Sequence, residues 1–189
     1  MKQRKPIPRG FHYPGRAYFI TTVVKNRIPC LQNRAYQFII LKTLAIFSII
    51  RKYQISALSI LPDHMHMVIN VGDNPITNIM HTFKSNSSRQ INRQLKPEFH
   101  FSWQKSFLGH RVRNEEDLQR RLQYIVGNPS HHSLSGFTWV SQFHMGNNLE
   151  QLYGRLAEML TNPTQEKMVD ETVMKIFGLD EKDCQIYNY

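Results

Sequence analysis

Hydrophobic and polar residues along this chain follow the repeat of a strand in some stretches and the repeat of a helix in others. Residues 17–24 (Ala-Tyr-Phe-Ile-Thr-Thr-Val-Val) are rich in β-branched and aromatic side chains, which predicts a first strand. Three more strands are predicted, at 55–61, at 64–71 and within 99–112. Only Pro62-Asp63 separates the second strand from the third, so these two are predicted to pair as an antiparallel hairpin.

Helical spacing of apolar residues predicts helices between the strands. Asn33 can cap a first helix over 34–53, and a second helix is predicted at 76–95. Asn114 can cap a third helix from Glu115 to about Val126, with acidic residues in the first turn, where the helix dipole favours them.

The end of the third helix and the chain beyond it are less regular. Gly127-Asn128-Pro129 is expected to close or kink the helix, and the chain is expected to be loop-like from Pro129 to about Asn148. Two further helices are predicted at 149–160 and 164–177. The order strand, helix, strand, strand, helix, strand indicates an α+β fold. It is the ferredoxin-like (split βαβ) arrangement, an antiparallel sheet with helices on one face, followed here by further helices.

The predicted strand 64–71 has two unlike faces, because successive side chains of a strand point to opposite sides. One face is wholly apolar and belongs in a core (Met65, Met67, Ile69 and Val71). The other face presents His64 and His66 side by side, spaced to hold one metal ion or one phosphate. Two surface histidines on a half-buried strand would show the same spacing.

A second candidate group lies at the end of the third helix. Tyr124 and Asn128 are four residues apart, so they share a face if the helix continues to Asn128. The Asn128 carbonyl oxygen can add a third ligand to the two imidazoles, a set that suits Mg²⁺ or Mn²⁺. Tyr124 can then act as a nucleophile. The ordinary alternatives are a tyrosine packed on the sheet and an asparagine that caps the helix.

The charge of the chain points to a polyanionic partner. Lys and Arg number 24 against 14 Asp and Glu, a formal net charge of +10. Residues 150–189 carry eight acidic and four basic residues, so the net charge is −4 there and +14 over residues 1–149. Nucleic acid is the commonest partner of so basic a body. The candidate DNA-binding residues are Lys5, Arg9, Lys84, Arg89, Arg93, Arg111 and Arg113.

Cysteine usage and hydropathy predict a cytoplasmic protein with no membrane segment. Cys30 and Cys184 form no metal-binding or redox spacing, which fits a reducing compartment. The basic start of the chain has no apolar stretch behind it, unlike a signal peptide. The most apolar segment, 38–50, is too short to cross a bilayer.

Two motifs together resemble a known family. His64-Met65-His66 matches the His–hydrophobic–His (HUH) motif, and the run Tyr124-Ile125-Val126-Gly127-Asn128-Pro129 matches the tyrosine signature of single-tyrosine HUH transposases. With Leu61-Pro62-Asp63 before the first histidine, the chain looks most like the REP-associated tyrosine transposase branch. The resemblance covers roughly residues 9–140.

This resemblance implies a metal-dependent enzyme that cleaves single-stranded DNA beside hairpins and rejoins strands. It assigns Tyr124 as nucleophile, forming a 5′-phosphotyrosine, with Mg²⁺ or Mn²⁺ held by His64, His66 and Asn128. The expected partner is single-stranded DNA with palindromic hairpins, and a homodimer is one assembly that the family allows. A catalytic domain is expected over 1–148, with a basic arm at 1–15, followed by an acidic helical extension over 149–189.

Two other classes remain open at this point. A relaxase or replication initiator shares the His-X-His motif and the same chemistry, although such enzymes usually carry larger domains. A non-catalytic module that binds hairpin DNA or RNA could use the same sheet topology. That class reads bases with aromatic residues on its central strands, whereas the third strand here offers histidines.

Overall fold

A computed structural model describes residues 15–95, 98–131, 137–140, 149–161 and 165–179. Five strands form one antiparallel sheet in the order β4-β1-β3-β2-β5. The strands are β1 (Ala17–Val23), β2 (Tyr53–Ile60), β3 (His64–Val71), β4 (Leu108–Arg111) and β5 (Phe137–Val140). The predicted ferredoxin-like order of the first four strands is confirmed, and β5 extends the sheet beside β2.

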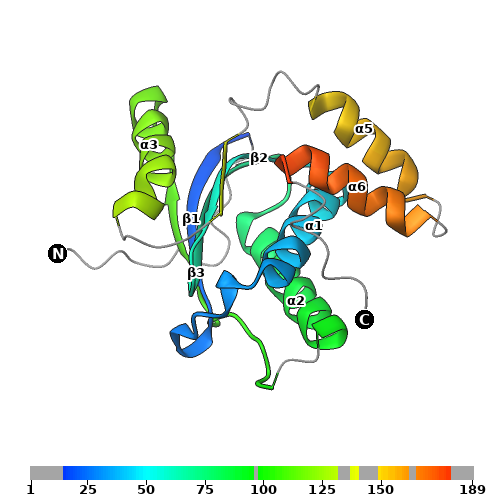
Figure 1. Ribbon diagram of the computed structural model, residues 1–189. Helices are drawn as coiled ribbons and strands as arrows, with labels where there is room; N and C mark the ends of the chain where they lie inside the picture. The colour runs from blue at the N-terminus through cyan, green and yellow to red at the C-terminus, as the bar shows by residue number, and fades with distance from the viewer. Residues whose placement is uncertain (1–14, 96–97, 132–136, 141–148, 162–164, 180–189) are drawn as a thin grey trace.

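Helices cover both faces of the sheet (Figure 1). The helices are α1 (Arg34–Arg51), α2 (Ile76–Leu95), α3 (Glu115–His131), α5 (Leu149–Met159) and α6 (Glu166–Phe177). Helices α1 and α2 pack on one face of the sheet, over the main hydrophobic core, and α3 lies alone on the other face.

The two faces of β3 separate as the alternation predicts. Met65, Met67, Ile69 and Val71 lie in the main core with the apolar residues of α1 and α2. Val68 points the other way, into a small cluster beneath α3 (Phe19, Ala57, Val68, Leu122 and Ile125). His64 and His66 therefore lie on the α3 side of the sheet.

The two predicted N-terminal helix caps, Asn33 and Asn114, are confirmed. The Asn33 side chain accepts from the Ala35 backbone N–H at 2.8 Å, and Asn114 Oδ1 accepts from the Asp117 N–H at 2.9 Å. Helix α1 ends at Arg51 rather than at residue 53, because Lys52 adopts the left-handed conformation (φ 50°). Strand β2 can then start at Tyr53, whose hydroxyl donates to the Leu44 carbonyl at 3.0 Å in the core.

The predicted fourth strand, within 99–112, is shorter in the structure. The fourth strand covers only 108–111, because Phe101 and Trp103 turn into the main core beside α2. Trp103 Nε1 donates to Ser87 Oγ at 2.9 Å. An aromatic-rich segment has the same composition whether it joins a sheet or fills a core, so its composition did not separate the two.

The structure contradicts two expectations near Pro129: that α3 closes at residues 127–129, and that the chain beyond is loop-like. Helix α3 runs through Pro129 to His131, since proline removes a single N–H and here only the last turn depends on it. The segment predicted as loop contains β5, which pairs with Ala57–Ile60 of β2. A strand of four residues has too few positions to show a period, and pairing with β2 stabilises it.

The C-terminal helices pack against the same core as the sheet. Leu156 of α5 and Val169, Val173, Ile176 and Phe177 of α6 are buried in the main cluster. Lys42 of α1 makes an ion pair with Asp170 of α6 at 2.5 Å. These helices lie on the α1 side, away from α3 (Figure 1). Among the described residues, no helix is long and apolar enough to cross a membrane.

Candidate active site

The site is built first from the two histidines of β3. His64 and His66 have ring centroids 4.9 Å apart and planes at 84°, so both rings occupy one small area of the sheet. His66 is only 5% exposed. The predicted pair is therefore formed at the sheet surface under α3, and a strand places it there because residues i and i+2 share a face.

Each imidazole has a polar partner at Nδ1. His64 Nδ1 lies 2.5 Å from Asp63 Oδ1, and His66 Nδ1 lies 2.8 Å from the Thr21 hydroxyl on β1. Arg27 NH1 donates to the second oxygen of Asp63 at 3.0 Å. Hydrogen bonds at Nδ1 orient a ring and direct Nε2 at a metal, the pattern found around ligating histidines.

The carboxyl group of Asp63 is held in its charged form. Its burial acts to raise the pKa, but the hydrogen bonds and charges of His64 and Arg27 outweigh burial and lower the pKa below its ordinary value. An ionised carboxylate at Nδ1 favours the tautomer of His64 in which Nδ1 carries the proton and Nε2 carries the lone pair that can bind a metal.

Tyr124 of α3 contacts His66. Its ring lies edge-on to the His66 ring, with centroids 5.2 Å apart, and its side chain is 43% exposed. Phe19 of β1 touches both partners: it stacks on His66 at 5.5 Å and meets Tyr124 edge-on at 5.7 Å. A phenol that contacts the metal-ligand candidate and is also open to solvent is placed to meet a large substrate.

Asn128 lies one helical turn beyond Tyr124, on the same face of α3. The residue is 1% exposed, and neither its amide oxygen nor its nitrogen has a hydrogen-bond partner among the described residues. A buried polar group left unpaired costs about 1–3 kcal/mol. A cation bound to the amide oxygen would remove part of that energetic cost. A donor set of two imidazoles and one amide oxygen fits Mg²⁺ or Mn²⁺.

No group of three His, Cys, Asp or Glu that could hold a metal ion occurs in the described ranges. A site with only two such residues needs a third donor of another type, which the Asn128 amide can supply.

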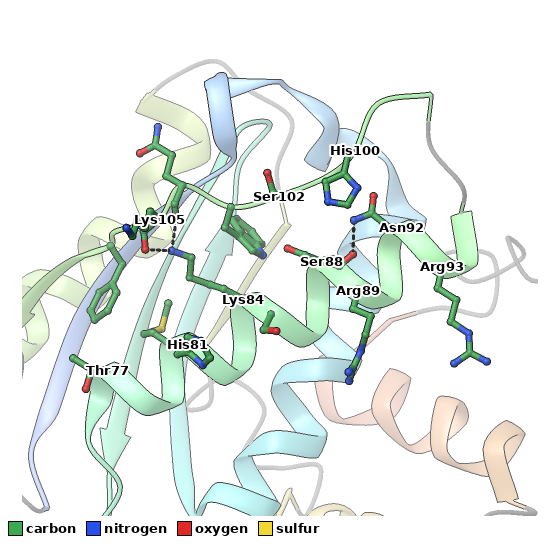
Figure 2. Close-up of a pocket in the computed structure, with 15 residues that line it drawn as sticks. Thr77, His81, Lys84, Ser88, Arg89, Asn92, Arg93, His100, Ser102 and Lys105 are labelled. Carbon is green, nitrogen blue, oxygen red and sulfur yellow. Dashed lines mark hydrogen bonds between the residues drawn. The ribbon is translucent and has the colours of Figure 1, made fainter.

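The basic candidates on α2 lie on the other side of the sheet from the histidines. Lys84, Arg89 and Arg93 line a cavity of about 730 Å³ between α2 and the segment 100–107 (Figure 2). The Lys84 ammonium donates to the carbonyls of Gln104, Lys105 and Ser106, so it holds that segment against α2. Burial lowers the pKa of Lys84 to about 8.

The other basic candidates are more scattered. Arg111 is exposed at the end of β4, and Arg113 is exposed two residues later. Lys5 and Arg9 lie outside the described residues. The structure thus brings His64, His66 and Tyr124 together but does not bring the α2 residues to the same face.

Several residues of the site were missed by sequence reasoning. Phe19 and Thr21 share one face of β1, which the alternation of strand 17–24 shows. Their contact with the site depends on the pairing register of β1 with β3, which sets Thr21 opposite His66 and Phe19 opposite Val68. This register joins strands that are far apart in the sequence, so no local pattern predicts it.

A sheet that presents two histidines side by side, beneath a helix bearing a tyrosine and an asparagine, defines the class of single-tyrosine HUH transposases. A family model described as "Transposase IS200 like" matches residues 14–128, more than half of the chain. The chain belongs to the family of IS200-like transposases.

Relatives within that family agree with the predicted branch. A protein of Haemophilus influenzae described as a REP-associated tyrosine transposase is 31% identical over 91 residues, covering 42% of this chain. This match spans 51% of that relative, about half its length. The solved structure of a REP-associated tyrosine transposase bound to a REP hairpin has a TM-score of 0.55 and 25% identity. The match covers 68% of this chain and 74% of that one.

Proposed function

We propose that this protein cleaves single-stranded DNA beside hairpin-forming repeats and transfers the cut strand through a covalent link to Tyr124. The observation that supports this proposal is the 5.2 Å distance between the Tyr124 and His66 ring centroids, because the proposed nucleophile then lies beside a metal-ligand candidate. The site supports transposition or the same chemistry in a domesticated enzyme. Family membership favours it over a relaxase or replication initiator.

The cleavage step balances without an external energy source. The Tyr124 oxygen bonds to the scissile phosphorus, and the bond from phosphorus to the 3′ oxygen of the preceding nucleotide breaks. The phenol proton passes to solvent and the leaving oxygen takes up a proton, giving a 5′-phosphotyrosine and a free 3′-hydroxyl. Attack by a 3′-hydroxyl on the phosphotyrosine then rejoins strands and restores the phenol.

The residues around Tyr124 divide the remaining tasks. His64, His66 and Asn128 would hold Mg²⁺ or Mn²⁺, which when bound would neutralise charge on the phosphate oxygens. Asp63 and Thr21 orient the two imidazoles through Nδ1. The rigid sheet fixes these groups, so most of the catalysis comes from position and charge.

The proposed substrate is single-stranded DNA that folds into a hairpin. The solved relative is bound to a REP hairpin, and the present chain carries a net charge of +10. The basic candidates Arg111 and Arg113, near β4, and Arg89 and Arg93, which line the cavity beside α2, are proposed to contact phosphates, with Lys5 and Arg9 of the N-terminal arm. Lys84 of the same cavity is proposed to add positive charge only, because its ammonium already donates to three carbonyls.

The proposal is tested by adduct formation on hairpin oligonucleotides taken from DNA that flanks the gene. Wild-type protein with Mn²⁺ is expected to give a protein–DNA adduct that survives denaturation and disappears with a chelator. Tyr124→Phe and His64→Ala are expected to give none. Tyr36→Phe is the matched control, because it removes a phenol hydroxyl from α1, on the far side of the sheet.

Three results would overturn the proposal. One is an adduct formed equally well by Tyr124→Phe, which would place the nucleophile elsewhere. Another is adduct formation that chelator leaves unchanged. The third is hairpin binding without an adduct in wild-type protein, which would favour the non-catalytic nucleic-acid-binding module.

A further inference from the structure

A buried carboxylate lies two turns before Tyr124 on α3. Asp117 is 5% exposed and accepts three hydrogen bonds from distinct directions. His110 Nε2 on β4 donates to it at 2.7 Å, the Arg113 backbone N–H at 3.2 Å, and Arg121 Nε at 3.2 Å. This network joins the edge strand β4, the turn after it and the first two turns of α3.

Arg121 connects this network to the proposed active site. Its guanidinium lies over the Phe19 ring, 5.3 Å from the centroid, and also makes an ion pair with Asp117 at 3.2 Å. Phe19 in turn contacts both His66 and Tyr124. A continuous series of contacts therefore runs from β4 through Asp117 and Arg121 to the ring that contacts both the nucleophile and the metal-ligand candidate.

The apolar contact of α3 with the sheet is small. Among the described residues of α3, Leu122 and Ile125 are buried in the cluster with Phe19, Ala57 and Val68, and Leu118 packs against it partly buried. The main core lies on the opposite face of the sheet. Two buried apolar side chains and one partly buried one restrain the rotation and tilt of a helix only weakly. A buried polar network whose members are paired can add restraint to the half of α3 that precedes Tyr124.

We propose that Asp117 and Arg121 are positioning residues that fix Tyr124 over His66, with His110 anchoring them to β4. This inference rests on the proposed strand-transfer function, for which the nucleophile must lie in line with the scissile phosphate. A displacement of about 1 Å at a reacting group can reduce rate by about a hundredfold. The network is therefore expected to affect the rate at which Tyr124 attacks the phosphate. It is not expected to change the affinity for DNA.

The same helix supplies a matched control pair. Glu116 and Arg120 are also four residues apart and form an ion pair at 3.8 Å, but their side chains are 77% and 65% exposed. In the corresponding pair, the side chains of Asp117 and Arg121 are only 7% and 20% exposed. Arg121→Ala and Arg120→Ala remove equal charge from adjacent positions, and Asp117→Asn and Glu116→Gln do the same for the acids.

The first experiment measures single-turnover adduct formation and hairpin affinity for these four variants and for Arg121→Lys. Arg121→Ala and Asp117→Asn are expected to slow adduct formation by about ten- to a hundredfold while the hairpin Kd stays within about twofold of wild type. Arg120→Ala and Glu116→Gln are expected to match wild type in rate. Arg121→Lys keeps the charge but loses the planar fork, so its rate is expected to stay well below that of wild type.

A second measurement needs no catalysis. Hydrogen–deuterium exchange of α3 residues 115–126, in protein without DNA, is expected to be faster in Asp117→Asn and His110→Gln than in Glu116→Gln. If wild-type protein forms no adduct, the proposed function fails, and exchange alone decides whether the network restrains α3.

The inference is wrong if Arg121→Ala and Arg120→Ala slow the reaction equally, since charge loss would then explain both. It is also wrong if Arg121→Ala weakens hairpin binding in proportion to the rate, because Arg121 would then be a DNA contact. Equal exchange rates of α3 in Asp117→Asn and Glu116→Gln would show that the Asp117 network does not restrain the helix, which the proposal requires.

Discussion

The hydrogen bond between Thr21 and His66 allows a direct test of whether β1 orients a histidine of the candidate active site. When Nε2 of His66 binds a cation, Nδ1 must carry the ring proton, which it can donate to Thr21 Oγ1 at 2.8 Å. Thr21→Val replaces the hydroxyl by a methyl group of nearly the same size. The substitution therefore removes the orienting contact at His66 and leaves the strand intact.

The size of the effect follows from the role of the bond. Loss of an outer-shell partner of a ligating histidine weakens metal binding by about 10–100-fold. The hydroxyl is a neutral partner, so we expect the lower end, about tenfold or about 1.4 kcal/mol. At a metal concentration about 100 times the wild-type Kd, binding stabilises the protein by about 2.7 kcal/mol, and a tenfold weaker site leaves about 1.4 kcal/mol.

The assay is the rise in Tm on addition of Mn²⁺, measured without DNA. Thr21→Val is expected to show about half the wild-type rise. Thr22→Val is the matched control, because Thr22 is the next residue of β1, is 0% exposed, and its hydroxyl has no hydrogen-bond partner among the described residues. Its metal-induced rise is expected to equal that of wild type. Equal rises in all three proteins would refute the assignment of Thr21 as an outer-shell residue.

Two further predictions concern stability. Ile176→Ala, at a 0% exposed position of α6, is expected to lower the free energy of unfolding by about 2–5 kcal/mol. Met168→Ala, at a 47% exposed position of the same helix, is expected to change it by less than about 0.5 kcal/mol. Denaturant unfolding that shows α6 melting separately would contradict a shared core. Burial acts to raise the pKa of Asp117, but hydrogen bonds from His110 and Arg113 and the nearby charges lower it below 3.8. The charged form therefore stabilises the fold at higher pH, and this contribution is lost as pH falls from about 4 through the lowered pKa. In Asp117→Asn, the free energy of unfolding is expected to fall less between about pH 4 and lower pH than in wild-type protein, whereas Glu116→Gln is expected to keep the wild-type pH dependence. Equal pH dependences in the two variants would contradict a stabilising role for the charged Asp117.

The sequence by itself predicted most of the elements and the faces on which the candidate site residues lie. Alternation in 64–71 assigned Met65 and Met67 to the core and the two histidines to the opposite face, because strand geometry forces a period of two. The spacing of Tyr124 and Asn128 placed them on one helix face for the equally local reason of the helical repeat. The paired motifs predicted the family that the family model then confirmed.

Only the tertiary structure decided which partners these residues meet. Thr21 reaches His66 through the register of β1 on β3, and Asp117 meets His110 only because α3 folds back beside β4. Pairing of segments far apart in the chain depends on the whole core, so no local repeat encodes it. The same reason explains why β5 was missed: four residues become a strand when the edge of β2 offers hydrogen bonds to complete.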